Sequence, residues 1–135
     1  MTDIKIQSPT TIIADDYDRL VELVELTKDV MPEISFCLKQ ELDRATIVTD
    51  ADPASVQMGS MVRFRDDATA TVRDIQLVYP VDSDLGDGRL SVLTPVGSAL
   101  LGQQAGTTAS CRDRAGRTRS LTVVAVQPPH ATSDR

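Results

Sequence analysis

The stretch LSVLTPVGSALLG at residues 90–102 joins two kinds of local structure. A strand-like run stops at Thr94 and Pro95, and a Leu-rich turn of helix begins directly after it. Thr94 suits the N-cap, and Pro95 suits the first helical position because a proline there loses no hydrogen bond. Gly102 suits the left-handed residue that ends a helix. The stretch therefore predicts a strand that passes into a short, capped helix.

Strand-like segments surround this junction. GSMVRFR alternates with Val62 and Phe64 on one face, and ATVRDIQLVYP follows after a polar turn. After the short helix, TTASCRDRAGRTRSLTVVAVQ predicts a hairpin that turns at RAGR, with Leu121, Val123 and Ala125 facing inward. The second half of the chain therefore predicts a small, strongly bent antiparallel sheet with one short helix.

The first part of the chain predicts a helical hairpin. Asp15 and Asp16 suit the cap of a first helix, whose apolar residues recur at helical spacing through residues 15–29. Pro32 suits the first turn of a second helix over residues 32–48. Two helices of about 13 residues with so short a linker must run antiparallel, and each is about 20 Å long.

Composition divides the chain near residue 52. The 135 residues are 41% hydrophobic but only 3% aromatic, so the core must be aliphatic. Residues 1–50 carry all of the net charge of -6, whereas the rest contains equal numbers of Asp and Arg and neither Glu nor Lys. We expect an α+β chain with a helical N-terminal segment at 1–52, a sheet-rich domain at 53–128 and a disordered tail at 129–135.

The sequence contains no signature of a membrane protein, of a metal site or of a catalytic site. No apolar run approaches the roughly 20 residues that span a bilayer, and the start lacks an apolar leader, so we expect a cytoplasmic protein without a membrane partner. Cys37 and Cys111 lack metal-ligand spacing, and the single histidine, His130, lies in the predicted tail. We therefore expect no metal, no other cofactor and no catalytic site.

Charged residues at the two predicted turns leave alternatives open. Asp29 and Glu33 flank Pro32 at the tip of the helical hairpin, where they either bind magnesium weakly or, for Glu33, simply favour the start of the second helix. Four arginines flank the later hairpin turn and suggest phosphate contacts: Arg112, Arg114, Arg117 and Arg119. No aromatic residue lies among them and the chain is acidic, so we expect no direct nucleic-acid binding.

The order of motifs resembles a known family. ELDRA at residues 41–45, VRFR at 62–65, LVYP at 77–80 and the stretch at 90–102 together resemble the GreA/GreB family of bacterial transcription factors. ELDRA and LVYP resemble in particular its Rnk type, the regulators of nucleoside diphosphate kinase. The resemblance covers nearly the whole chain, from about residue 12 to residue 127.

The resemblance implies an FKBP-like C-terminal domain that binds RNA polymerase at the rim of its secondary channel, with the helical hairpin, a coiled coil, pointing into the channel. In Gre factors a long coiled coil carries an acidic tip to the active site and stimulates cleavage of backtracked RNA. Helices of about 20 Å are much shorter, and TKDVMP lacks a recognisable Gre acidic motif. We therefore expect a monomeric, non-enzymatic regulator that competes with Gre factors, whose effect on nucleoside diphosphate kinase is indirect.

The predicted contact surface is an apolar ledge at the strand-to-helix junction, and its residues are Thr94, Pro95, Val96, Ala99 and Leu100. The alternative is that Val96, Leu100 and Leu101 simply cover the sheet. Pro95 and Val96, at the start of the helix, are the better candidates for contact. Two other functions stay open: a Gre-type cleavage factor acting through Asp29 and Glu33, and a peptidyl-prolyl isomerase suggested by the implied fold alone.

Overall fold

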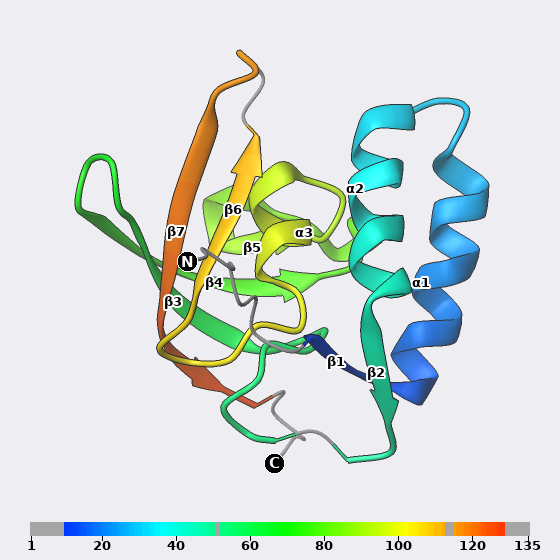
Figure 1. Cartoon of the computed structure of the whole chain (residues 1–135), viewed down its shortest axis with the longest axis horizontal. Coiled ribbons are helices and arrows are strands. Elements are labelled where there is room, and N and C mark those ends of the chain that lie inside the picture. Colours follow the sequence, from blue (N-terminus) through cyan, green and yellow to red (C-terminus); the bar gives the residue numbers. More distant parts are fainter. Residues whose placement is uncertain (1–9, 51, 113–114, 129–135) are drawn as a thin grey trace, which may run out of the picture.

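The computed structural model describes residues 10–50, 52–112 and 115–128, and its architecture is α+β (Figure 1). Two helices lie side by side, and a curled sheet with a short helix forms the rest of the molecule. The helices are α1 (Ala14–Thr27), α2 (Pro32–Asp43) and α3 (Pro95–Leu100). The strands are β1 (Thr10–Ile13), β2 (Ala45–Val48), β3 (Met61–Asp66), β4 (Thr71–Val78), β5 (Arg89–Ser91), β6 (Thr108–Arg112) and β7 (Thr118–Gln127).

The two N-terminal helices differ from the sequence prediction at the start of α1 and at the end of α2. β1 passes straight into α1, so Ile13 occupies the N-cap and Asp15 and Asp16 lie in the first turn instead of capping it. α2 begins at Pro32 as predicted but ends at Asp43, and residues 45–48 form β2, parallel to β1. Three β-branched residues in a row favour the strand over a longer helix there.

The main sheet is mixed, whereas the sequence predicts an antiparallel sheet. Its strand order is β5-β4-β3-β7-β6, and β5 pairs parallel to β4. The connection between these two strands contains two short 3-10 turns, Pro80–Asp82 and Leu85–Asp87, and returns the chain to the same edge in the same direction. The connection is therefore a crossover.

A β-bulge in β7 changes which residues face the core. The register against β3 skips Val124. Leu121 and Val123 are buried as predicted, but Ala125 is exposed because the bulge reverses the alternation beyond it, and Val126 packs against the core instead. The extra residue is the physical reason that the simple inward pattern fails at Ala125.

One hydrophobic core joins the helices to the sheet. It includes fully buried side chains from α1, α2, α3 and the strands, among them Leu20, Leu38, Leu77, Leu100 and Val123. Aliphatic residues dominate it, as the low aromatic content predicts. Because both parts share this core, the positions of the helices and of α3 are fixed relative to each other.

Polar contacts also hold β1 against the sheet domain. Gln57 is buried, its side-chain nitrogen donates to the Thr11 carbonyl oxygen at 2.6 Å, and its oxygen accepts from the Ile13 amide at 3.2 Å. Gly102 has a φ of +79°, and a Cβ there would lie 2.3 Å from the Thr10 methyl carbon. Glycine is therefore required at Gly102 both by backbone conformation and by the close approach of β1.

Other parts of the sequence-based description stay predictions. These are the FKBP-like topology, the coiled-coil character of the hairpin and the domain boundary at residue 52. The predicted tail at 129–135 lies outside the described residues. Among the described residues, none of the helices is long and apolar enough to span a bilayer.

Candidate functional site

The strand-to-helix corner at the start of α3 has the capping geometry that the sequence predicts. The Gly97 amide donates to Thr94 Oγ1 at 3.0 Å, and the same hydroxyl donates to the Ser91 carbonyl oxygen at 2.8 Å. Pro95 occupies the first helical position. Gly97 packs so closely on the preceding strand that a Cβ there would lie 2.3 Å from the Ser91 carbonyl oxygen. The corner is therefore fixed by hydrogen bonds and by backbone packing.

Burial divides the predicted ledge into two groups. Ala99 is 7% exposed and Leu100 is 0% exposed, so both side chains pack into the core and offer no contact surface. Thr94, Pro95 and Val96 are half-buried and reach the surface. The surface that a partner could touch is therefore these three residues, which we call the α3 corner, while Leu100 covers the sheet.

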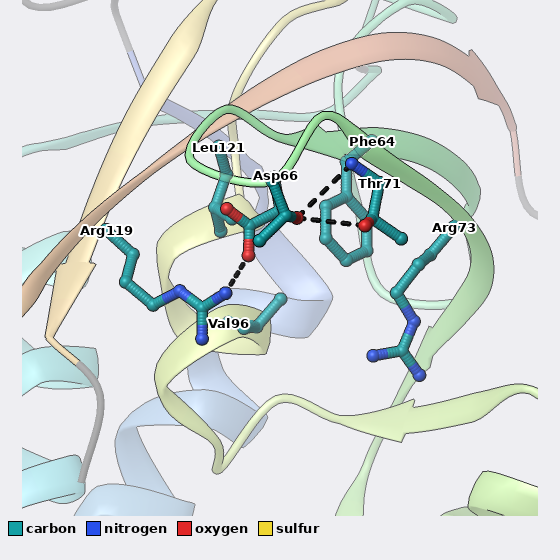
Figure 2. Close-up of a pocket in the computed structure, with 8 residues that line it drawn as sticks. Phe64, Asp66, Thr71, Arg73, Val96, Arg119 and Leu121 are labelled. Atoms are coloured by element: carbon teal, nitrogen blue, oxygen red, sulfur yellow. Dashed lines mark hydrogen bonds and ion pairs between the residues drawn. The ribbon is translucent and has the colours of Figure 1, made fainter. Parts of the chain in front are cut away.

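A pocket of about 260 Å³ opens beside the α3 corner, and Val96 forms part of its wall. Figure 2 shows Arg119 and Arg73 at two sides of the pocket, with Val96 between them in this view. The pocket is lined by side chains from β3, β4, β7 and the β3–β4 turn as well as α3: Phe64, Asp66, Thr69, Thr71, Arg73, Val96, Arg119 and Leu121.

Strand register explains how these residues meet. Phe64 pairs with Arg73 across β3 and β4, and Asp66 pairs with Leu121 across β3 and β7. Residues directly opposite each other point to the same side of a sheet. Arg119 lies two residues before Leu121 and shares its face. Three strands therefore direct their charged residues toward one place on the α3 side of the sheet.

The charges in this pocket do not cancel. Arg119 pairs with the carboxylate of Asp66, whose side chain is 12% exposed, whereas no ion pair or side-chain hydrogen bond within the described part of the chain holds the guanidinium group of Arg73. Arginines on the opposite face differ, since Arg63 and Arg65 bind carboxylates and their side-chain hydrogen bonds lower the pKa of Asp74 and Asp67.

The tip of the helical hairpin is exposed and short. Asp29 and Glu33 lie on its surface, as the sequence predicts, on either side of Pro32. The turn is closed by the Met31 amide, which donates to the Thr27 carbonyl oxygen at 2.7 Å. Within the described residues, no group of three or more His, Cys, Asp or Glu side chains is arranged to hold a metal ion.

Several residues that the sequence suggests as functional lie outside this site. Of the four arginines around the β6–β7 turn, only Arg119 reaches the pocket; Arg112 and Arg117 lie on the exposed surface, and Arg114 lies outside the described residues. His130 also lies outside them. The sequence did not indicate that Asp66 and Arg73 line one pocket, because their meeting depends on the pairing of distant strands, for which the local sequence holds no signal.

The chain matches two protein-family descriptions. Residues 51–128 match the family described as "Transcription elongation factor, GreA/GreB, C-term", and residues 9–48 match "Rnk N-terminus". The chain belongs to the GreA/GreB family and carries the Rnk N-terminus. The α3 corner and the pocket both lie within the GreA/GreB segment, and Asp29 and Glu33 lie within the Rnk segment.

Named relatives agree with this membership. The chain is 39% identical over 101 residues to the "Regulator of nucleoside diphosphate kinase" of Escherichia coli K12, covering 73% of this chain and 74% of that protein. It is 29% identical over 116 residues to the "Transcription inhibitor protein Gfh1" of Thermus thermophilus, covering 84% and 74%.

A solved GreA/GreB structure is also similar. The "Prokaryotic transcription elongation factor GreA/GreB from Nitrosomonas europaea" aligns with a TM-score of 0.70 at 34% identity, covering 87% of this chain and 98% of that chain. These GreA/GreB relatives are named as regulators or transcription factors. The family membership therefore supports a transcription-factor-like regulator.

Proposed function

We propose that this protein is a non-enzymatic regulator that binds RNA polymerase at the rim of the secondary channel and competes there with Gre factors. The observation that carries the proposal is the α3 corner, which is held by the Thr94 cap, reaches the surface with half-buried side chains and lies in the GreA/GreB segment. Relatives named as an elongation factor and as a transcription inhibitor act in the same process, which supports RNA polymerase as the partner.

The α3 corner has the physical properties of a protein contact. Its side chains are apolar or neutral, and its backbone is held by the Thr94 cap and by the close packing of Gly97 on β5. A contact surface that is already ordered before binding loses little conformational entropy on association. The buried Ala99 and Leu100 contribute by holding the corner in place.

The length of the hairpin argues against transcript cleavage. α1 has 14 residues and α2 has 12, which correspond to about 21 Å and about 18 Å of helix. A hairpin of this length places Asp29 and Glu33 well short of the point that a long Gre coiled coil reaches. We therefore propose that the hairpin obstructs the channel entrance without supplying carboxylates to the catalytic magnesium.

The proposal also covers the oligomeric state, the location and the domains of the protein. The protein acts as a monomer in the cytoplasm, where RNA polymerase is found, with the helical segment at 1–52 and the polymerase-binding domain at 53–128. Its influence on nucleoside diphosphate kinase is indirect, through transcription, because no described feature indicates nucleotide chemistry. Neither a peptidyl-prolyl isomerase nor a cleavage factor gains a specific observation from the structure.

A pull-down with core RNA polymerase tests the proposed contact. The double variant Pro95→Asp/Val96→Asp should lose most binding, because two carboxylates replace the apolar surface of the corner. It should fold with reduced stability, because Val96 also packs against the core, whereas aspartate in the first turn of a helix interacts favourably with the helix dipole. Val72→Asp is the matched control, because Val72 is exposed on the opposite face of β4.

Circular dichroism first establishes that each variant is folded. Equal retention of wild type and the folded double variant would remove the α3 corner as the contact surface. Loss of binding in Val72→Asp as well would show that added negative charge alone weakens the complex.

A further inference from the structure

The pocket beside the α3 corner carries one more positive than negative charge. Its ionisable side chains are Arg73, Arg119 and Asp66, so the pocket is cationic in a chain whose net charge is -6. Asp66 is buried and already satisfied by Arg119. Arg73 is exposed and, among described residues, forms no ion pair. One guanidinium group is therefore left for an external anion.

The walls of the pocket suit an amino-acid side chain. Phe64, Leu121 and Val96 supply an apolar surface, and the Thr71 hydroxyl, which accepts from Thr69 at 2.9 Å, adds a polar group at the rim. A volume of about 260 Å³ accommodates one side chain with its carboxylate. Guanidinium groups bind carboxylates through paired, charge-assisted hydrogen bonds.

We infer that this pocket binds an aspartate or glutamate side chain of RNA polymerase, held by Arg73 while the α3 corner contacts the adjoining apolar surface. The inference rests on the proposed function, because the pocket and the corner share Val96 and a partner on one reaches the other. A protein carboxylate is favoured over nucleic-acid phosphate, because the pocket is a single small concavity with apolar walls and the chain as a whole repels polyanions.

Equilibrium binding of the full chain to core RNA polymerase, measured over a range of sodium chloride concentrations, tests the inference. Arg73→Gln should weaken binding by about tenfold at low salt, and Arg73→Glu by more, because the carboxylate then lacks its partner. The affinity of the wild type should fall with added salt, and that of Arg73→Gln should fall less steeply.

Arg63→Gln is the matched control. Arg63 is an exposed arginine on the neighbouring strand, but it faces the opposite side of the sheet and pairs with Asp74. Its variant should bind like the wild type, with the same salt dependence. Unchanged affinity and salt dependence in Arg73→Gln would overturn the inference.

Comparison of these variants distinguishes failure of the pocket inference from failure of the proposed function. If Arg73→Gln binds normally while Pro95→Asp/Val96→Asp does not, the pocket inference fails and the proposed function stands. If the wild type does not bind polymerase, both fail. A labelled single-stranded RNA oligonucleotide is the probe for the phosphate alternative, and binding of it that depends on Arg73 would overturn the assignment to a protein carboxylate.

Discussion

Tyr79 donates a hydrogen bond of 2.8 Å from its hydroxyl group to Oδ1 of Asp16. The contact joins the residue that follows β4 to the first turn of α1, across 63 positions in the sequence. Both side chains are half-buried. This hydrogen bond therefore helps to fix the direction in which the helical hairpin leaves the sheet.

Tyr79→Phe should destabilise the protein by about 1 kcal/mol, because the half-buried Asp16 loses a hydrogen-bond partner. Tyr17→Phe is the matched control, since the Tyr17 hydroxyl binds no described residue and the ring is also half-buried. Urea unfolding followed by circular dichroism measures both. Equal losses in the two variants would show that the hydrogen bond contributes nothing specific.

Asp16 should make folding stability fall as pH rises. Burial raises the pKa of Asp16 above its ordinary value of 3.8, while the hydrogen bond from Tyr79 and the charge of Arg19 oppose that shift. The folded state therefore retains this proton to higher pH than the unfolded state, so the stabilising contribution is present below 3.8 and is lost as pH rises through the folded pKa.

Asp16→Asn should remove that dependence, because the amide oxygen still accepts from Tyr79 and carries no charge. The free energy of unfolding is measured at a series of pH values from about 3.5 to about 7, the range over which carboxyl groups titrate. It should fall less with rising pH in Asp16→Asn than in the wild type. An identical profile in wild type and variant would contradict the assignment.

Gly102→Ala should cost about 3 kcal/mol, the sum of left-handed backbone strain and a clash with Thr10. Gly106→Ala isolates the first effect, because Gly106 also has a positive φ but has open space where a Cβ would lie. It should cost about 1 kcal/mol. Thermal or urea unfolding measures both, and equal losses would mean that β1 does not pack against Gly102.

Thr94→Ala should destabilise the protein by about 1 kcal/mol and weaken polymerase binding, because the α3 corner loses its cap. Thr94→Ser keeps the hydroxyl and should restore both properties. Unfolding experiments and the polymerase pull-down provide the two readouts. A stable Thr94→Ala variant with normal binding would show that the cap does not hold the corner.

Local signals made much of the α3 corner predictable. The capping role of Thr94, the place of Pro95 and the left-handed Gly102 all depend on residues a few positions apart, and the structure confirms each. The buried alternation of Val62 and Phe64 is confirmed for the same reason.

Features set by distant pairing were not predictable in this way. Ala45 continues the apolar spacing of α2, and although the β-branched residues after it favour a strand, its partner β1 lies far away in the sequence. The parallel pairing of β5, the bulge at Val124 and the pocket around Arg73 likewise depend on the register of strands far apart in the sequence.

Hairpin length leads to a prediction about stalled transcription complexes. The protein should release no 3′ RNA fragments from backtracked complexes, because Asp29 and Glu33 lie at the end of helices of only 14 and 12 residues. A Gre factor is the positive control. Fragment release that disappears in Asp29→Asn/Glu33→Gln would instead establish a cleavage factor.

Displacement of a labelled Gre factor from core RNA polymerase is the most direct test of the account. The wild-type protein at several-fold excess should displace the Gre factor, and Pro95→Asp/Val96→Asp should not, because both proteins would occupy the rim through the same corner. Retention of the Gre factor on polymerase at every concentration of the folded wild-type protein would contradict the account.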